Sequence, residues 1–340
     1  MVTIRDVGER ARVSLGTVSR VLNGHPSVRP AVRASVNHAI RDLGYVPNPA
    51  ARSLRSGRTH TLGLIVPDLL NPMTVALVRG VEDAGGRAGY TLLLAESRLD
   101  PHLEETHIAK LLERRVDGLL CSPVQSIAAV ERCVKRPGTS VLPTVLLQLR
   151  RPRREFLTAY VDEAPAIGAC TDYLLALGHR RVAIVHSSSH PAGGRHRRDV
   201  LRAALCGRGI DEGADLDRIF SEAAECYQGV REILARPDRP SVMLVGIHQF
   251  VPATLQAIRD AKLQIPADLS LVVFGDSDWA RATTPPLSTI VVNQEEHAEG
   301  AVQLLLQVIG GEASTARHVR SESVYVVRES TGPAPKEGSR

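Results

Sequence analysis

The chain has 340 residues, of which 43% are hydrophobic and 23% are charged. This composition excludes a disordered or fibrous protein, and no apolar run approaches the roughly 18 residues that a membrane-spanning helix needs. The length exceeds the ~250–300 residues at which single cores stop growing, which predicts a small module attached to a larger body. The N-terminus is too charged for a signal peptide and the five cysteines form no close pair, so we expect a protein of the reducing cytoplasm.

Positive charge is concentrated in the first 58 residues. They hold ten arginines against Asp6, Glu9 and Asp42, a net charge of +7, which leaves −2 for the rest of a chain whose total is +5. A basic head on a slightly acidic body is typical of a polyanion-binding module on a carrier domain. The alternative is that arginine is abundant throughout this sequence for reasons unrelated to a partner.

The head predicts short helices over residues 4–11, 15–22 and 30–43. Thr3 and Asp6 form a capping-box pattern before the first helix, and Ser14 is a suitable N-cap for the second. Pro30 suits the first position of the third helix, and Gly44 suits its end. Short helices with a tight turn between the first two predict a helix-turn-helix domain. Its expected core residues are Val7, Val18, Val21, Val32 and Ile40.

The second predicted helix is the candidate recognition helix. Such a helix enters the major groove by its N-terminal residues, so Leu15, Gly16 and, one turn further, Arg20 are the candidate base-reading residues. Arg20 is the expected hydrogen-bonding reader. Short hydroxyl and amide side chains nearby have the reach for phosphates rather than bases. The candidate phosphate contacts are Thr3, Ser14, Thr17, Ser19 and Asn23.

Residues 48–58 predict a hinge. Asn48 as N-cap and Pro49 as first helical residue begin a helix of barely two turns, far below the ~12–15 residues at which an isolated helix is marginal in water. We therefore expect it to fold on DNA or on a partner helix. Leu54 lies between Arg52 and Arg55, the composition of an apolar minor-groove wedge flanked by arginine. The alternative role of Leu54 is ordinary packing against the body.

Three blocks of this region resemble the DNA-binding head and hinge of the LacI/GalR (lactose-repressor) family of bacterial transcription regulators: TIRDV at 3–7, VSLGTVSRVLNG at 13–24 and GYVPNPAARSL at 44–54. The likeness continues more weakly to about residue 329, through RRVDGL at 114–119, LGHRRV at 177–182, IPADLS at 265–270 and PPLST at 285–289. The resemblance assigns the minor-groove wedge to Leu54. The hinge contacts expected in the minor groove are Asn48, Ala51, Arg52, Leu54 and Arg55.

Two positions of the head depart from the family pattern. The family usually has glycine where Arg12 stands and alanine where Gly8 stands. A left-handed arginine costs ~1–2 kcal/mol, and a glycine inside a helix costs ~1 kcal/mol relative to alanine. We therefore expect a head that is less stable in the absence of DNA.

After Arg58, short apolar runs alternate with helical stretches. Continuous apolar strands separated by helices predict parallel sheets covered on both faces. The family resemblance implies the two-lobed fold of periplasmic sugar-binding proteins, with crossovers near 161–163, 291–293 and 320–323. The strands are expected at 62–66, 90–95, 117–121, 144–148, 181–185, 242–246, 271–274 and 289–292.

The predicted fold class is therefore an all-α helix-turn-helix domain joined to an α/β, two-lobed, periplasmic-binding-protein-like domain with parallel sheets. The helix-turn-helix domain is expected at 1–47, the hinge helix and linker at 48–58, the effector-binding and dimerisation domain at 59–329, and a flexible tail at 330–340. Lobe one is expected at about 59–161 and 293–319, and lobe two at about 162–292 and 320–329.

The residues that follow the strands are the candidate effector site, because parallel α/β sheets bind ligands beyond the carboxyl ends of their strands. Arg197 matches the arginine of the family's effector cleft, where a guanidinium can hold hydroxyls, carboxylate or phosphate. Trp279, the only tryptophan, is expected either to stack on a sugar ring or purine or to pack within its lobe. His248 has no neighbour at metal-ligand spacing, so no metal is expected. The candidate effector residues are Asn71, Met73, Asp162, Arg197, His248, Asp276 and Trp279.

The cleft departs from the pattern of sugar-binding relatives. Ile247-His248 stands where they usually have Asn-Asp, and Gly275 precedes Asp276 where a pair of aspartates is expected. Two polar anchors for neutral hydroxyls are thus missing, whereas Arg197 keeps a cation. An ionic hydrogen bond contributes ~1.5–3 kcal/mol against ~1 kcal/mol for a neutral one. We therefore expect an acidic effector, such as a sugar acid or phosphorylated sugar, or no effector at all.

The leading hypothesis is a homodimeric, ligand-responsive transcription regulator, a repressor, that binds a near-palindromic operator in double-stranded DNA. The dimer follows from the resemblance and because one small head reads too few base pairs for genomic specificity; a tetramer stays open. The alternatives are a regulator with a degenerate cleft, a small-molecule binding protein and an enzyme. An enzyme is disfavoured because common catalytic and cofactor motifs are missing, and because the adjacent Asp162 and Glu163 would alternate sides of a strand. No cofactor is expected.

Overall fold

The computed structural model describes residues 2–22, 25–46, 57–124, 127–135, 141–148, 156–187, 193–210, 216–311 and 317–335. The chain divides into two compact units, Met1–Thr59 and His60–Arg340. Six of the predicted DNA contacts lie outside the described residues, and their roles stay predictions: Asn23, Asn48, Ala51, Arg52, Leu54 and Arg55.

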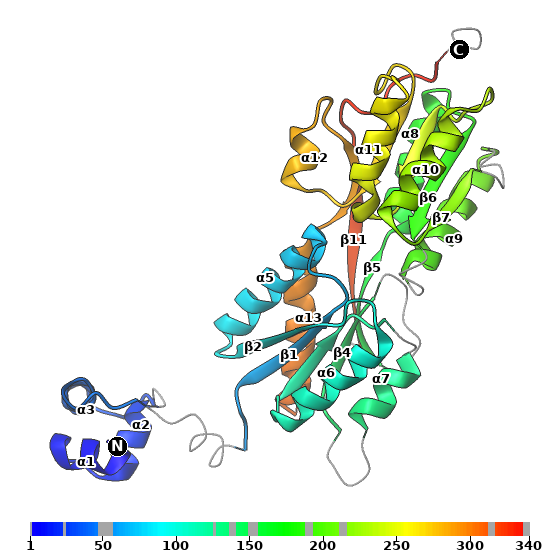
Figure 1. Ribbon diagram of the computed structural model, residues 1–340. Helices are drawn as coiled ribbons and strands as arrows, with labels where there is room; N and C mark the ends of the chain where they lie inside the picture. The colour runs from blue at the N-terminus through cyan, green and yellow to red at the C-terminus, as the bar shows by residue number, and fades with distance from the viewer. Residues whose placement is uncertain are drawn as a thin grey trace. The chain divides into compact units, whose positions relative to one another are not determined.

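The first unit has the three predicted helices of the head, with the predicted bounds: α1 (Ile4–Ala11), α2 (Leu15–Leu22) and α3 (Pro30–Leu43) (Figure 1). The capping box is confirmed, because the backbone N–H of Thr3 donates to Asp6 at 2.7 Å and that of Asp6 donates to Thr3 at 3.4 Å. Gly44 ends α3 in the left-handed conformation, as expected. The head therefore takes its helix bounds from local sequence signals.

A small core holds these helices together. Val7, Val18 and Val36 are fully buried, one from each helix. Val21 is buried beside them, whereas the predicted core residues Val32 and Ile40 are half-buried at the edge of the same cluster. Burying a valine of this kind stabilises a fold by about 1.5–3 kcal/mol, so a cluster of six buried apolar side chains can hold a domain this small.

The turn between α1 and α2 explains both departures from the family pattern. Arg12 has φ 54° and ψ 44°, a left-handed conformation in which its N–H donates to Glu9 O at 3.2 Å. Gly8 is buried, and a Cβ there would lie 3.0 Å from the carbonyl oxygen of Val13. Glycine at position 8 therefore gives the turn room, and arginine at position 12 carries its backbone strain.

Replacing Arg12 by glycine is expected to stabilise the free head by about 1 kcal/mol, because glycine adopts the left-handed conformation without the Cβ penalty. Hydrogen exchange of the α1 and α3 amides in the full chain measures this change. The control is Arg5→Gly inside α1, which is expected to destabilise the head by about 1 kcal/mol. Slower exchange in both variants, or in neither, would contradict the strain at Arg12.

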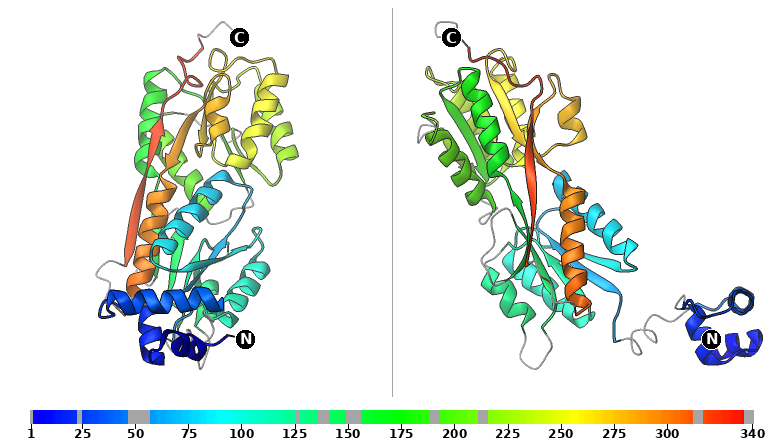
Figure 2. Two further views of the ribbon diagram at one scale, coloured as in Figure 1. Left: turned by 90° about the vertical axis from the view of Figure 1, so that its left-hand side faces the viewer. Right: turned by 180° about the vertical axis from the view of Figure 1, so that it is seen from behind.

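The N-terminal lobe of the second unit is a sheet with helices on both faces (Figures 1 and 2). Along its first strand, side chains alternate between the two faces. Leu62 and Leu64 pack with α5 and α13, whereas Ile65 packs with α6 and α7. The elements are β1 (Thr61–Val66), α5 (Pro72–Arg87), β2 (Thr91–Glu96), α6 (Pro101–Glu113), β3 (Gly118–Cys121), α7 (Ile127–Val134), β4 (Thr144–Gln148), β5 (Leu157–Asp162) and the returning α13 (Gln294–Ile309).

The C-terminal lobe repeats this plan. Its core lies on both faces of a second set of strands, with α8 and α9 on one face and α10 and α11 on the other. β6, β8 and β9 are parallel neighbours, so their carboxyl ends meet at one edge. The elements are α8 (Ala164–Ala176), β6 (Val182–Ser187), α9 (Gly193–Cys206), β7 (Asp217–Phe220), α10 (Ala223–Leu234), β8 (Val242–Val245), η1 (His248–Phe250), α11 (Val251–Asp260), β9 (Ser270–Phe274), α12 (Asp278–Ala282) and β10 (Ser288–Val292).

The long strand β11 (His318–Val326) joins the two sheets (Figure 2). Its first half pairs in parallel with β5 up to Glu322, and its second half pairs antiparallel with β10 from Ser323 onward. The described strands therefore form one hydrogen-bonded series in the order β2-β1-β3-β4-β5-β11-β10-β9-β8-β6-β7. The eight expected strands are present, while β5, β7 and β11 were not anticipated and the antiparallel pair corrects the expectation of purely parallel sheets.

The expectation of a flexible tail from residue 330 is wrong for its first part. Ser330 and Thr331 are buried, and the Ser330 hydroxyl donates to Leu271 O at 2.6 Å. His179 lies 3.0 Å from the carbonyl oxygen of Gly332 through Nε2, while its Nδ1 lies 2.8 Å from the Ser241 hydroxyl. Residues 330–335 thus pack on the C-terminal lobe, because each of these polar groups finds a partner there.

Candidate functional site

The start of α2 presents the candidate base-reading residues. Leu15 is 45% exposed, and Gly16 and Arg20 are exposed as well. Val18 and Val21, on the same helix, face the core. The guanidinium of Arg20 makes no hydrogen bond or ion pair with any part of the chain that the structure describes. One face of α2 is therefore anchored and the other is available to a groove.

Three of the candidate phosphate contacts, Thr3, Ser14 and Thr17, are hydroxyls at helix N-termini. The Thr17 N–H donates to Ser14 Oγ at 3.3 Å, which confirms Ser14 as the cap of α2, and the two hydroxyls lie 3.0 Å apart. The Thr3 hydroxyl donates to Asp6 at 2.9 Å, and the backbone and side-chain hydrogen bonds from Thr3 hold the pKa of Asp6 below its usual value. Ser19 is half-buried. Helix N-termini attract phosphate through their free N–H groups, so these positions suit the predicted role.

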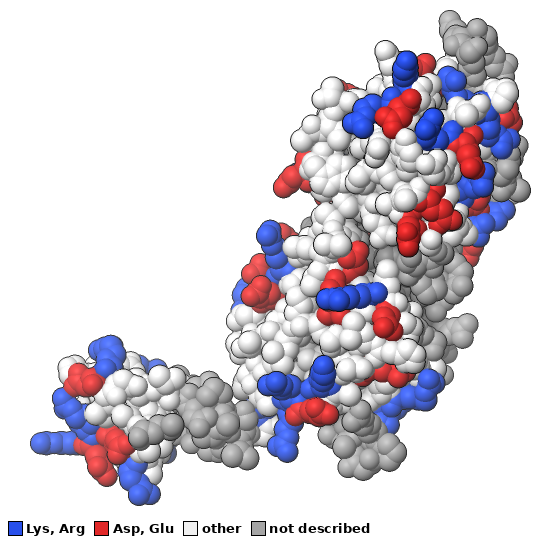
Figure 3. Space-filling model, viewed as in Figure 1, with Lys and Arg blue, Asp and Glu red and all other residues white. Residues whose placement is uncertain are grey.

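Most of the head's positive charge is on its surface. Arg10 pairs with Asp42 at 2.6 Å, which uses one arginine of the unit. On the face seen in Figure 3 the head has more basic than acidic side chains, whereas both signs are mixed over the body. The other exposed arginines of the head are Arg5, Arg12, Arg20, Arg29 and Arg41. A cationic surface around α2 is what a phosphate backbone requires.

In the second unit, Arg197 is held by other residues of its own lobe. Its Nε donates to Glu163 at 2.8 Å and its Nη2 donates to the other oxygen of the same carboxylate. Its Nη1 donates to the carbonyl oxygen of Gly246, and its guanidinium carbon lies 4.4 Å from the centre of the Phe274 ring. The side chains of Arg197 and Glu163 are only 16% and 7% exposed. The pair is thus a built, nearly buried feature.

A second cluster joins the two lobes. Gly275 follows β9 with φ +95°, and a Cβ at this position would lie 3.1 Å from Cγ of Met73, which α5 brings from the N-terminal lobe. The same point lies 3.5 Å from Nδ1 of His248, whose ring lies 4.8 Å from that of Trp279. Trp279 also packs against the lobe's core. Met73 therefore occupies the space that a longer side chain at position 275 would fill.

The other candidate effector residues form hydrogen bonds with the protein backbone or ion pairs with arginines of the chain. Asn71 caps α5 by accepting from the Met73 N–H at 3.0 Å. Asp162 pairs with Arg320 at 2.9 Å and caps Ala164 at 3.1 Å. Burial raises the pKa of Asp276, but hydrogen bonds from Arg328 and Arg281 outweigh it and leave the pKa below its usual value. Asp276 Oδ1 nevertheless has no hydrogen-bond partner within the described ranges.

The structure thus divides the candidate effector residues instead of gathering them around one point. Met73, His248 and Trp279 share one cluster, and Arg197 lies in another. The premise of an uncompensated cation at Arg197 is wrong, because Glu163 neutralises it. Sequence reasoning considered Glu163 only as the neighbour of Asp162 and missed this partnership. An acidic residue directly after the strand at a lobe crossover is the signal that could have found it.

Replacing Gly275 by alanine is expected to lower the free energy of unfolding by about 1–2 kcal/mol, because an L-residue at φ +95° is strained. The added Cβ also contacts Met73. In the double variant with Met73→Ala this contact is removed, so we expect recovery of the part of the unfolding free energy lost to the contact, but not of the part lost to backbone strain. Urea unfolding followed by Trp279 fluorescence measures both. Gly86→Ala is the control, since a Cβ there meets nothing within 4 Å; an equal response of positions 86 and 275 would contradict the strain.

Among the described helices, none combines the length and apolar character needed to cross a membrane. Within the described ranges, no group of three or more His, Cys, Asp or Glu side chains is arranged to hold a metal ion.

Two family models match the chain. The model of bacterial regulatory proteins of the lacI family matches residues 3–48, and the model of the periplasmic binding protein-like domain matches residues 171–331. The ribose operon repressor of Escherichia coli (strain K12) is 31% identical over 313 residues, which covers 91% of this chain and 93% of that protein. Catabolite control protein A of Priestia megaterium is 28% identical over 335 residues, covering 97% and 99%.

Solved structures agree with this likeness. The crystal structure of the lac repressor dimer bound to operator and the anti-inducer ONPF matches with a TM-score of 0.84 at 25% identity, over 97% of this chain and 99% of that one. A complex of the transcriptional regulator CelR with cellobiose matches with a TM-score of 0.70 at 27% identity. The relatives named as repressors regulate transcription and are not enzymes, in line with the prediction for this chain.

Proposed function

The chain belongs to the LacI family of bacterial regulatory proteins, and from this membership we propose that it is a repressor that binds a near-palindromic operator as a homodimer. It acts on the nucleoid in the bacterial cytoplasm. The observation that carries the proposal is the exposed start of α2, where Leu15 and Gly16 lie with Arg20, which has no partner in the described part of the chain, on a cationic head. A recognition helix reads base edges in the major groove from this position.

Selection from a random-sequence DNA library, followed by gel shift, tests this function. A sequence-specific dimer is expected to enrich two inverted half-sites at a fixed spacing. Affinity is expected to fall steeply with salt, since a head of this charge releases counterions from the phosphates. Recovery of no enriched sequence, or of a single half-site without symmetry, would contradict the proposal.

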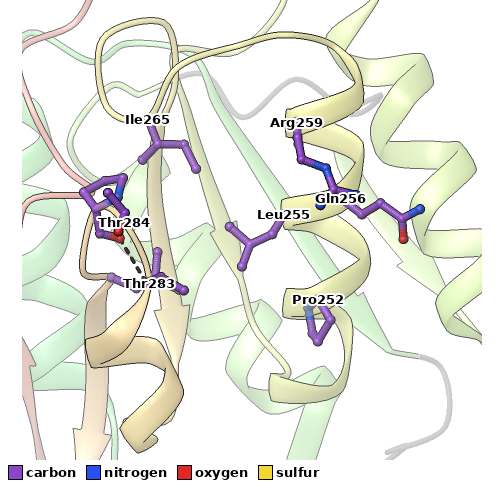
Figure 4. A pocket seen from close by; sticks show the side chains of 9 residues that line it. Pro252, Leu255, Gln256, Arg259, Ile265, Thr283 and Thr284 are labelled. Atoms are coloured by element: carbon purple, nitrogen blue, oxygen red, sulfur yellow. Dashed lines mark hydrogen bonds between the residues drawn. The ribbon is translucent and has the colours of Figure 1, made fainter.

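An apolar edge strand and a hollow with a mixed polar and apolar lining support the dimer. β2 is an edge strand, and it exposes Leu94 at 42%, near the exposed Leu70 and Val75 around the start of α5. In the C-terminal lobe, a hollow of about 390 Å³ lies between α11 and the chain that follows α12 (Figure 4). Pro252 and Leu255 line one side of this hollow, and Ile265 and the Thr283 region line the other. Exposed apolar edges and hollows of this kind favour association with another protein surface.

A small metabolite between the lobes is the proposed effector, and sugars are its class. The Escherichia coli ribose operon repressor and the CelR complex with cellobiose support this class by their similarity to the chain. A ligand that prefers one arrangement of the lobes changes operator affinity only by its differential affinity for the two arrangements. Calorimetry with a panel of sugars measures ligand binding, and operator titration in the presence of each sugar measures DNA affinity. An effector is a sugar that binds and also changes the operator affinity.

A second candidate is a repressor that needs no effector. The observation that favours it is the cluster in which Met73 fills the space over Gly275, while Asp162 and Arg197 are paired with protein partners. Under this alternative, operator affinity is unchanged by every sugar in the panel. A Met73→Ala variant that gains sugar binding would then identify the filled cleft as the cause.

A further inference from the structure

The ion pair of Arg197 with Glu163 lies where a ligand of this fold would meet the C-terminal lobe. Glu163 follows β5, Gly246 follows β8, and Phe274 ends β9, so the groups around the guanidinium come from the carboxyl ends of the strands. The contact of Met73 with Gly275, next along the chain from Phe274, shows that this edge faces the other lobe. The pair therefore belongs to the wall of the cleft between the lobes.

The guanidinium keeps only part of its hydrogen-bonding capacity. Arginine has five N–H donors. Two are used by the carboxylate of Glu163 and one by the carbonyl oxygen of Gly246, which leaves two that have no partner among the described residues. One face of the group is covered by Phe274 at 4.4 Å. The site can therefore donate to a ligand oxygen, but its positive charge is already matched by an adjacent negative charge.

The other groups around this pair do not restore a net charge. His186, at the end of β6, is 2% exposed, and its Nδ1 lies 2.7 Å from the Cβ position of Gly246. Burial, with a smaller effect of Arg197 and Arg198, lowers the pKa of His186 to about 3, so its ring is neutral at physiological pH. Arg198 is itself paired with Asp217 at 2.7 Å.

We propose that Glu163 is a specificity-determining residue that cancels the charge of Arg197, so that this part of the cleft accepts uncharged ligands and rejects anions. The inference rests on the proposed function for the existence of an effector, but not for the charge of the site. An anion that approached Arg197 would meet Glu163 at hydrogen-bonding distance from the same guanidinium. Displacing Glu163 would leave a nearly buried carboxylate without its partner, which is strongly unfavourable.

Sulfate is a suitable probe, because it tests the charge of the site without knowledge of the effector. Thermal unfolding of the full chain is followed by fluorescence of Trp279, the only tryptophan, which reports on the C-terminal lobe and not on the basic head. Sulfate is titrated against chloride at constant ionic strength. The wild type is expected to show no saturable stabilisation that depends on Arg197, so its response should equal that of Arg197→Ala.

The Glu163→Gln variant is expected to gain a sulfate site at least about tenfold tighter than any in the wild type, because one uncompensated cation remains at low exposure. Adding Arg197→Ala is expected to abolish this gain. The matched control is Asp172→Asn, which removes a carboxylate from the same helix, α8, where it pairs with Arg208 on the surface. Its sulfate response is expected to equal that of the wild type.

A merely structural role of Glu163 predicts loss of stability without any gain of anion binding. A folded Glu163→Gln variant with no new sulfate site would therefore overturn the proposal. If the Glu163→Gln variant does not fold, the comparison of the wild type with Arg197→Ala still tests the proposal. Sulfate binding that is present in the wild type and absent in Arg197→Ala would also overturn the proposal. Because neither measurement uses DNA or a sugar, failure of the proposed operator function is distinguishable from failure of this inference.

Discussion

Replacement of Asp276 by alanine is expected to lower the free energy of unfolding of the C-terminal lobe by about 3 kcal/mol, at the low end of the range for breaking a buried ion pair. Its carboxylate is 8% exposed and accepts from Arg328 at 2.9 Å. Arg281 lies at 3.0 Å from the same oxygen. Without Asp276 the guanidinium of Arg328, itself only 18% exposed, loses its counter-ion. Urea unfolding followed by Trp279 fluorescence measures the loss.

A matched control is available two residues from this site on the same segment. Asp278 is fully exposed, and its carboxylate lies 4.0 Å from Arg281. An exposed pair of this kind contributes little, so Asp278→Ala is expected to change the free energy of unfolding by less than about 0.5 kcal/mol. Equal effects at the two positions would show that Asp276 does not anchor the C-terminal segment.

The same ion pair predicts a pH dependence. The pKa of Asp276 is lowered in the folded state, although burial alone would raise it, because the hydrogen bonds from Arg328 and Arg281 are stronger. A lowered folded pKa gives stability that is fully present above the unfolded value of about 3.9 and is lost as the pH falls through the folded pKa. The wild type is therefore expected to have a higher free energy of unfolding than Asp276→Ala above about pH 4, and this difference is expected to disappear only below that pH.

The parts of the fold that were predicted are those with local signals. Thr3 with Asp6, Ser14 and Gly44 each mark a helix end within a few residues, and the structure has α1, α2 and α3 at the predicted bounds. The missed strands carry polar residues along their length, which interrupt the apolar pattern. β11 buries Ser321 and Ser323 instead, where the Ser321 hydroxyl lies 3.0 Å from His297 Nδ1 and the Ser323 hydroxyl donates to Asp162 O. A central strand whose buried side chains are small and polar lacks the apolar pattern from which strands are predicted, so the sequence predicts a loop there.

The effector cleft was predicted less well because its contacts join distant parts of the chain. The residues after each strand could be named, but their partners could not. Arg197 and Glu163 lie on different helices, and Met73 reaches Gly275 from the other lobe. The charge of Arg197 was visible in the sequence, whereas its cancellation depends on how α8 and α9 pack. The anion preference inferred from residue type assumed an uncompensated Arg197, and the pairing of Arg197 with Glu163 contradicts that assumption.

Replacement of Arg20 by alanine is expected to weaken binding to the selected operator by about 5- to 150-fold, the effect of losing 1–3 kcal/mol of base discrimination. The effect is expected at one base pair in each half-site, where the preference should relax. The physical reason is that Arg20 is exposed one turn beyond Leu15 and Gly16 and has no partner among the described residues. Its two-pronged guanidinium suits the acceptor pair on a guanine edge.

Arg29→Ala separates base reading from simple charge. Arg29 is an exposed arginine of the same head, at the N-cap position of α3 and outside the candidate recognition helix, so both variants remove one positive charge. A phosphate or long-range contribution weakens operator and random DNA alike and reduces the salt slope by about 1. Arg29→Ala is therefore expected to change the two affinities by the same factor, while Arg20→Ala lowers the ratio of operator to random binding. Competition gel shifts at two salt concentrations give both quantities. An unchanged ratio in Arg20→Ala would remove Arg20 from the base-reading residues and leave the exposed Leu15 and Gly16 face of α2 to contact the groove without it.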